Sequence, residues 1–138
     1  MAIITGSTDI DDQHLLLAQA CGTLEKAIGL DPDSLVFRAA WQSFEEIMED
    51  HILSEGPLLR LLPLEQADAH AAAHTRSLML LRNYKVDQDP GRTALRGLLR
   101  DVHAHMNSVE EQPLSAVVRS ALAQGLPLPT TLRAPRRI

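Results

Sequence analysis

The sequence predicts an all-α protein, an up-down-up-down antiparallel four-helix bundle with a metal site in its core. Three observations predict this class of fold. Apolar residues recur at alternating steps of three and four, which is typical of helices that bury one face. Proline or glycine interrupts this pattern at three places, and short connections favour antiparallel neighbours. Histidine and glutamate occupy positions of this apolar pattern that would lie at the same height along neighbouring helices.

The composition limits the class of protein further. The chain has 138 residues, 45% of them hydrophobic, which suits one domain with a real core. Its formal net charge of −5 gives no reason to expect nucleic acid. The single Cys21 rules out an internal disulfide and suits a reducing compartment. No apolar run has the roughly 20 residues of a membrane span, and the chain start does not resemble a signal peptide. We therefore expect a cytoplasmic protein without a membrane partner.

The first helix should begin at Thr8, because Thr8 and Asp11 have the spacing of a capping box. Gly29 and the sequence Asp31-Pro32-Asp33 should end this helix and start the next one. The inward stripe consists of Ile10, His14, Leu17, Cys21, Leu24 and Ile28. Residues 1–7 are then an N-terminal arm.

The second helix buries a longer stripe that ends in polar residues. The stripe consists of Phe37, Trp41, Phe44, Met48, His51, Glu55, Leu58 and Leu62. Pro57 removes one backbone hydrogen bond and crowds the carbonyl of Leu53, so we expect a kink or early fraying just past Glu55.

The third helix should follow Pro63, and the fourth should follow Asp89-Pro90. Asp89-Pro90 predicts a cap with proline at the first helical position. The fourth helix is expected to continue through Val117 and to stop near Gly125. The third helix carries Ala67, His70, His74, Leu78, Leu81 and Tyr84, and the fourth carries Leu95, Leu98, Val102, His105 and Val109. The bundle then spans residues 8–124, and residues 125–138 form a tail rich in proline and arginine.

The turns predict that the polar residues of all four helices lie at one height. His51 and Glu55 are four residues apart on one helix, as are His70 and His74 on the next, so each pair shares a helix face. The two pairs are symmetric about Pro63. The other two turns bring His14 and the region of His105 and Glu110 to the same level. At about 1.5 Å rise per residue, an error of two residues moves a ligand only about 3 Å.

This inventory of five imidazoles and two carboxylates predicts a metal centre. A lone His-x-x-x-Glu is usually a surface contact, and a single histidine on an apolar stripe is usually satisfied by its neighbours. Burying five unpaired imidazoles together would be costly, which favours a metal. Two ions that share carboxylate bridges would use all seven ligands. Nitrogen and oxygen ligands without thiolate suit iron or manganese better than structural zinc. We expect iron, although manganese or zinc could replace it on purification.

Some assignments near the fourth helix stay open. Glu110 is five residues after His105, so a π-bulge would be needed to align its carboxylate, and Glu111 is the rival ligand. His103 should face outward as a surface histidine. Asp101 could accept a hydrogen bond from His105, but a solvated charge is the simpler interpretation. Cys21 is expected to be a small buried side chain.

The candidate ligands resemble the pattern of the hemerythrin-like (HHE cation-binding) family, His…His-x-x-x-Glu…His-x-x-x-His…His-x-x-x-x-Asp/Glu on four helices. The match runs from His14 to Glu110 and includes the five-residue step. The resemblance implies a non-haem di-iron centre in which Glu55 and Glu110 bridge the two irons together with an oxo or hydroxo group.

The resemblance also divides the histidines between the two irons. It implies that His70, His74 and His105 hold one iron. His14 and His51 would hold the other iron, which keeps an open position for dioxygen.

Two classes of function fit these ligands. The first is dioxygen binding for storage, delivery or sensing, which the resemblance favours. The alternative is an enzyme: an oxidase, an oxygenase, or a protein that consumes peroxide or nitric oxide. Iron storage is a weaker third hypothesis. Aromatic residues make up only 3% of the chain, and Ile52, Val102 and Met106 flank the ligands, so a pocket here could admit a small substrate. The same seven candidate ligands would serve all these functions, so the sequence separates the functions poorly. The sequence also does not predict the oligomeric state.

Overall fold

The computed structural model describes residues 8–85, 88–89, 91–107 and 111–126, and within them every regular element is a helix. This confirms the predicted all-α class. The elements are α1 (Thr8–Ala27), α2 (Leu35–Glu55), the 3-10 helix η1 (Gly56–Leu61), α3 (Leu64–Asn83), α4 (Thr93–Met106) and α5 (Glu111–Ala123). The N-terminal arm 1–7 and tail residues 127–138 lie outside the described residues.

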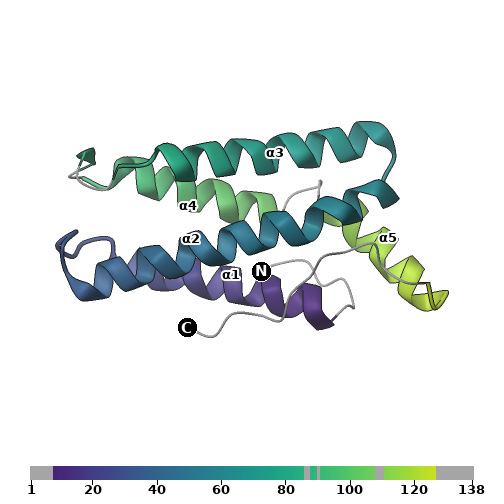
Figure 1. Ribbon diagram of the computed structural model, residues 1–138, viewed down its shortest axis with the longest axis horizontal. Coiled ribbons are helices and arrows are strands. Elements are labelled where there is room, and N and C mark those ends of the chain that lie inside the picture. The colour runs from purple at the N-terminus through teal and green to yellow at the C-terminus, as the bar shows by residue number, and fades with distance from the viewer. Residues whose placement is uncertain (1–7, 86–87, 90, 108–110, 127–138) are drawn as a thin grey trace.

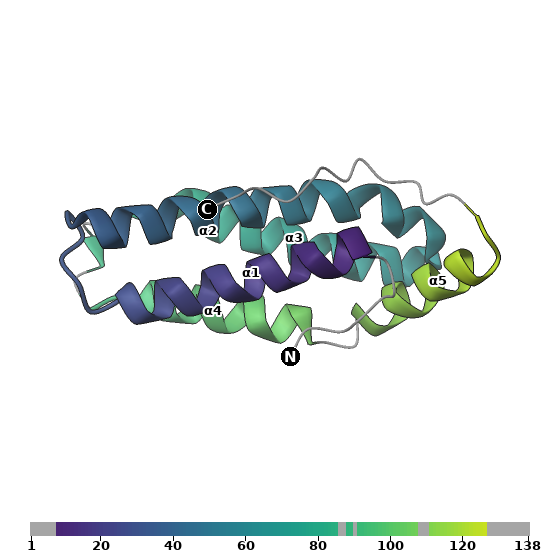
Figure 2. The same ribbon diagram turned by 90° about the horizontal axis from the view of Figure 1, so that it is seen from below.

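The helices α1 to α4 run side by side along the long axis of the molecule (Figures 1 and 2). Helix α1 packs on α2 and α4, and α3 packs on the same two helices. Helix α5 leaves this array at one end, where it contacts η1. The arrangement is compatible with a helical bundle, whereas the strict up-down-up-down order stays a prediction.

The connection between α1 and α2 is built from the turn residues that the sequence predicts. The Asp31 carboxylate accepts a hydrogen bond from the backbone N–H of Asp33 at 2.9 Å. Ser34 is the N-cap of α2, and its hydroxyl accepts from the backbone N–H of Phe37 at 3.2 Å. The first contact stabilises the turn, and the second satisfies a backbone donor that the helix start would otherwise leave open. Helix α1 is described from Thr8, the first described residue, so the predicted capping box at Thr8 stays a prediction.

Helix α2 ends at Glu55, and the chain continues as the 3-10 helix η1 with Pro57 in its first turn. This confirms the expected change of the helix just past Glu55. Proline lacks the N–H that an α-helix needs at this position, while the first turn of a new helix tolerates it. Glu55 is therefore the last α-helical residue of α2, directly before the change.

The expected start of the fourth helix is wrong by three residues. Helix α4 begins at Thr93, not at Pro90, and its N-cap Arg92 has a left-handed backbone with φ of 54°. Asp89 still caps the helix through its side chain. Its carboxylate accepts from the backbone N–H groups of Thr93 at 3.0 Å and of Leu95 at 3.2 Å. The sequence thus predicts Asp89 as the capping residue correctly, but the turn between Asp89 and the helix is longer than predicted.

The prediction of one continuous fourth helix is also wrong. Helix α4 ends at Met106, and a separate helix, α5, begins at Glu111. Pro113 is the third residue of α5, where its missing N–H costs nothing; in the interior of a continuous helix it would break a hydrogen bond. Residues 108–110 between the helices, with Glu110 and the expected π-bulge, lie outside the described residues. Helix α5 ends close to Gly125, as predicted.

The buried apolar residues form two separate clusters. The larger cluster includes residues from α1, α2, α3 and α4: Leu17, Cys21, Leu24, Phe37, Phe44, Met48, Leu81, Leu95, Val102 and Met106. The smaller cluster consists of Ile10, Leu58, Leu59, Leu62, Leu114 and Val118. Along α1, from α2 into η1, and along α3, buried polar residues lie between the two clusters, and on α4 the buried His105 lies next to Met106. A polar layer thus divides the core.

None of the helices in the described part of the chain is both long and apolar enough to cross a lipid bilayer.

Candidate metal centre

The polar layer contains six of the seven predicted ligands. They are His14, His51, Glu55, His70, His74 and His105, and none is more than 7% exposed. They come from four helices, one from α1, two from α2, two from α3 and one from α4. The seventh predicted ligand, Glu110, lies outside the described residues, and the side chain of its rival Glu111 is not described either.

One oxygen of the Glu55 carboxylate faces histidines of α1 and α2. His14 Nε2 lies 2.8 Å from Glu55 Oε2, which is a hydrogen bond between α1 and α2. His51 Nδ1, one turn before Glu55 on α2, lies 3.5 Å from the same oxygen. The rings of His14 and His51 are neighbours, with their centroids 5.1 Å apart. These two imidazoles form one group beside Oε2.

The other oxygen of Glu55 faces histidines of α3. His70 Nε2 lies 3.0 Å from Oε1, and His74 Nε2 lies 3.6 Å from it. The two Nε2 atoms are 3.2 Å apart. The ring of His105 on α4 lies 4.9 Å from both of these rings, centroid to centroid. The two carboxylate oxygens therefore contact different imidazoles, and the His51 ring lies between the two sets, 5.1 Å from the His14 ring and 5.2 Å from the His74 ring.

The donor atoms are close enough to share a metal ion. His51, Glu55, His74 and His105 each offer one atom, and these four atoms all lie within 4.8 Å of one another. His14 and His70 add two further donors on either side of the same carboxylate. Neither ring nitrogen of His51 has a hydrogen-bond partner in the described part of the chain, although the ring is fully buried. Buried polar atoms normally have partners, so this set of residues fits a metal ion.

Burial and neighbouring side chains shift the pKa values of His51 and Glu55. It lowers the pKa of His51 well below the ordinary value of 6.5, and the neighbouring imidazoles act in the same direction, while Glu55 opposes them. Burial alone would raise the pKa of Glu55. The nearby His51 and hydrogen bonds from His14, His70 and His74 outweigh it and hold that pKa well below 4.5. A neutral imidazole and an ionised carboxylate are the forms that bind metal.

Several residues near the centre behave as the sequence predicts. His103 faces outward, and its Nε2 lies 3.0 Å from Glu25 on α1. Asp101 is exposed, which agrees with the simpler interpretation of a solvated charge. Cys21 is buried, and burial together with Glu25 raises its pKa to about 12.

The sequence analysis missed a polar pair beside the ligands, Gln13 and Ser54, which are 5% and 3% exposed. Gln13 Nε2 donates to Ser54 Oγ at 2.9 Å and lies 3.4 Å from the backbone carbonyl of Asp50. A signal was present, because Gln13 is three residues after Ile10. A helix with a broad buried face buries residues at both i+3 and i+4, whereas the predicted stripe of α1 includes only His14, at i+4 from Ile10.

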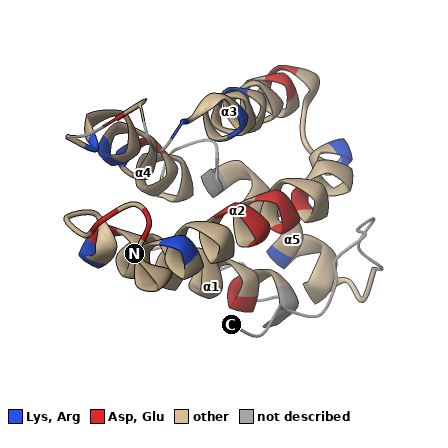
Figure 3. Ribbon diagram, turned by 60° about the vertical axis from the view of Figure 1, so that its left-hand side comes forward, with Lys and Arg blue, Asp and Glu red and all other residues tan. Residues whose placement is uncertain are grey.

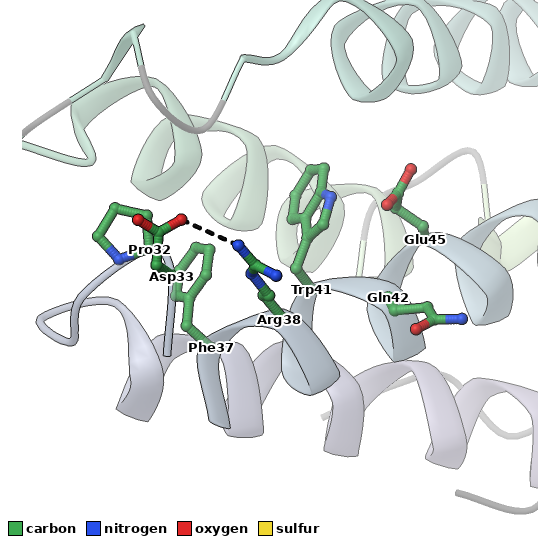
Figure 4. Close-up of a pocket in the computed structure, with 7 residues that line it drawn as sticks. All are labelled: Pro32, Asp33, Phe37, Arg38, Trp41, Gln42 and Glu45. Atoms are coloured by element: carbon green, nitrogen blue, oxygen red, sulfur yellow. Dashed lines mark hydrogen bonds and ion pairs between the residues drawn. The ribbon is translucent and has the colours of Figure 1, made fainter. Parts of the chain in front are cut away.

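A surface pocket of about 440 Å³ lies over the first half of α2 (Figure 4). Its lining includes Phe37 and Trp41 and the ion pair between Asp33 and Arg38, at 3.0 Å. None of the candidate ligands lines it. At its edge, burial and the neighbouring Glu49 and Glu46 raise the pKa of Glu45. Acidic residues of α2 are seen in red in Figure 3. This pocket is therefore not an entrance to the metal centre.

The centre itself is nearly closed. His51, Glu55 and His70 have no exposed surface, while His74 and His105 are 4% and 7% exposed. Val102 and Met106, which flank His105 on α4, are fully or almost fully buried. The small exposed fraction of the described ligands belongs to His14, His74 and His105.

No protein-family model matches the chain, and no curated protein or solved structure matches it. The interpretation of the centre therefore rests on its geometry and on the ligand pattern.

Proposed function

We propose that this chain is a hemerythrin-like, non-haem di-iron protein, an up-down-up-down antiparallel bundle that binds dioxygen at two iron ions bridged by Glu55. One observation carries the proposal. Both oxygens of the buried Glu55 carboxylate contact imidazoles, Oε2 those of α1 and α2 and Oε1 those of α3. Imidazoles beside both oxygens would let this carboxylate bridge two ions.

The two groups give each ion its own ligands. His14 and His51 would hold the ion beside Glu55 Oε2. His70 and His74, together with His105, would hold the ion beside Oε1. The ion with two histidines has fewer protein donors, so it is the one with room for an external ligand. A second bridge from Glu110, or from Glu111, belongs to the same proposal.

The donor set supports iron. It offers imidazole nitrogen and carboxylate oxygen without any thiolate, and its six described residues exceed the four ligands of a structural zinc site. Two ferrous ions held in this way would supply two electrons for binding or reducing dioxygen. The protein's own contribution is a dry, low-dielectric layer with a neutral imidazole at His51 and an ionised carboxylate at Glu55.

Burial favours a small ligand over an extended substrate. The six residues are between 0% and 7% exposed, so a diatomic molecule fits the access better than an organic substrate does. This is why we place dioxygen binding before the alternative, an oxidase, an oxygenase, or a protein that consumes peroxide or nitric oxide.

The proposal is tested by loading the full chain with ferrous iron under anaerobic conditions and counting bound iron. Two ions per chain are expected, and one or none would contradict the di-iron centre. Dioxygen is then admitted while the visible spectrum is recorded. A new absorption band that disappears under vacuum, with the ferrous state restored, is the result expected of a dioxygen-binding protein. Rapid and irreversible oxidation of the iron would contradict reversible binding and support the enzyme alternative.

A further inference from the structure

A buried hydrogen-bonded contact joins α1 to α2 next to the candidate ligands. Gln13 on α1 donates from Nε2 to Ser54 Oγ at 2.9 Å, and the carbonyl of Asp50 lies 3.4 Å from the same nitrogen. Each of the three residues directly precedes a candidate ligand: Gln13 precedes His14, Asp50 precedes His51, and Ser54 precedes Glu55. The contact therefore lies at the height of the group beside Glu55 Oε2.

The orientation of the Gln13 amide follows from its partners. A backbone carbonyl can only accept, so the amide group that faces Asp50 must be the NH₂ end. The other end, Oε1, is buried and has no hydrogen-bond partner among the described residues. Leaving a buried acceptor unsatisfied destabilises the folded protein. A leucine of similar volume would fill the same space without this cost, so packing alone does not explain a glutamine here.

We propose that Gln13 is a positioning residue for the two-histidine half of the centre, and this inference rests on the proposed di-iron function. The half formed by His14, His51 and Glu55 Oε2 spans the α1–α2 interface. Sliding one helix by a single residue moves its side chains by about 1.5 Å and turns them by about 100°. By fixing α1 against α2 through Ser54, Gln13 sets the distance between His14 and the carboxylate.

The other half of the centre does not depend on this contact. His70 and His74 come from α3 and His105 from α4, and none of them is a neighbour of Gln13 in the sequence. Loss of the Gln13 hydrogen bond should therefore weaken one iron position and spare the other. A residue with a merely structural role would lower the stability of the whole molecule and affect both positions alike.

The experiment compares the full-length wild type with the variants Gln13→Leu, Ser54→Ala and the double variant. Each metal-free protein is titrated anaerobically with ferrous iron against a competing chelator, and its thermal unfolding is followed without metal. Wild type should bind two ions. Gln13→Leu should weaken one of the two binding steps by roughly ten- to a hundred-fold, the range seen when residues behind metal ligands are changed, and leave the other step unchanged. The melting temperature of the metal-free protein should stay near that of wild type.

The double variant tests whether the hydrogen bond itself is responsible. Because both single changes delete the same bond, the double variant should bind iron no more weakly than the worse single variant. Ser115→Ala, which removes another buried serine hydroxyl on α5, is the matched control and should bind two ions like wild type. If Gln13→Leu does not fold, Ser54→Ala alone tests the same bond.

The outcomes separate this inference from the proposed function. Two ions in wild type with unchanged affinities in Gln13→Leu and Ser54→Ala would overturn the role of Gln13 and leave the di-iron centre standing. Equal weakening of both steps with a lower melting temperature would also overturn it, since that is a structural effect. Fewer than two ions in wild type would overturn the di-iron proposal and this inference with it.

Discussion

His14 Nε2 lies 2.8 Å from Glu55 Oε2, although 41 residues separate the two in the chain. The same carboxylate contacts His70 through its other oxygen, at 3.0 Å. Through its two oxygens, Glu55 therefore contacts imidazoles from α1, α2 and α3. Removal of this carboxylate is therefore the most direct test of the proposed bridge.

Replacing Glu55 by alanine should abolish stable binding of two irons, because both proposed positions lose their shared oxygen ligand. Iron content after anaerobic loading and gel filtration is the measurement. Glu45→Ala, on the surface of the same helix, is the control and should keep two ions. A Glu55→Ala protein that still holds two ions per chain would rule out the bridge.

His103 and His105 are two residues apart but have opposite roles. His105 is buried within 4.9 Å of the rings of His70 and His74, whereas His103 forms a surface pair with Glu25. We expect His105→Ala to weaken the three-histidine position by roughly ten-fold or more, and His103→Ala to leave both positions intact. A surface pair is worth about 0–1 kcal/mol, so His103→Ala should also fold normally. Equal loss of iron from both variants would contradict the assignment.

The metal-free protein should lose stability in mild acid. Burial lowers the pKa of His51 below its unfolded value of 6.5, so the unfolded chain binds more protons than the folded one below that pH. The free energy of unfolding should then fall as the pH drops from about 7 to 5, by at most about 1.4 kcal/mol per pH unit for this one group. Urea unfolding at several pH values measures this slope. His51→Phe should have a shallower slope, and an equal slope in the variant would assign the effect to other groups.

Cys21 should be unreactive in the folded protein. Its side chain is fully buried and its pKa is raised to about 12, so almost no thiolate exists at pH 8. Alkylation by iodoacetamide at pH 8 should be slow in the native state and fast in urea, with mass spectrometry as the readout. Rapid alkylation of the native protein would show that this part of α1 opens readily.

Much of the site could be predicted because helices have a constant rise. Once Pro63 and the Asp31-Pro32-Asp33 turn were recognised, symmetry about each turn was enough to bring His14, His51 and His70 to one height. The structure places these rings in one buried layer. Which carboxylate oxygen faces which ring could not be predicted, because this depends on side-chain rotamers that only the packed structure fixes.

The wrong predictions concern places where the helix, with its constant rise per residue, is interrupted. Helix α4 ends at Met106, and Pro113 belongs to a new helix, so symmetry about a turn says nothing of the residues between them. The late start of α4 has a similar cause, because the Asp89 side chain bridges several residues of turn to reach Thr93 and Leu95. Gln13 was missed for another reason. Its position three residues after Ile10 indicates burial, but no local pattern pairs it with Ser54, which is 41 residues away.

The layer of ligands that separates the two apolar clusters also divides the molecule into parts that can open independently. Along α1 and from α2 into η1, buried polar residues, among them the candidate ligands, lie between the larger cluster and the smaller one with Leu58, Leu59 and Leu114. Local opening begins where few apolar contacts cross a boundary. With ions in place, the layer joins the clusters and the protein should unfold as one unit. Without them, amide hydrogens around the smaller cluster should exchange first, so that the iron content of the protein determines how cooperatively it folds.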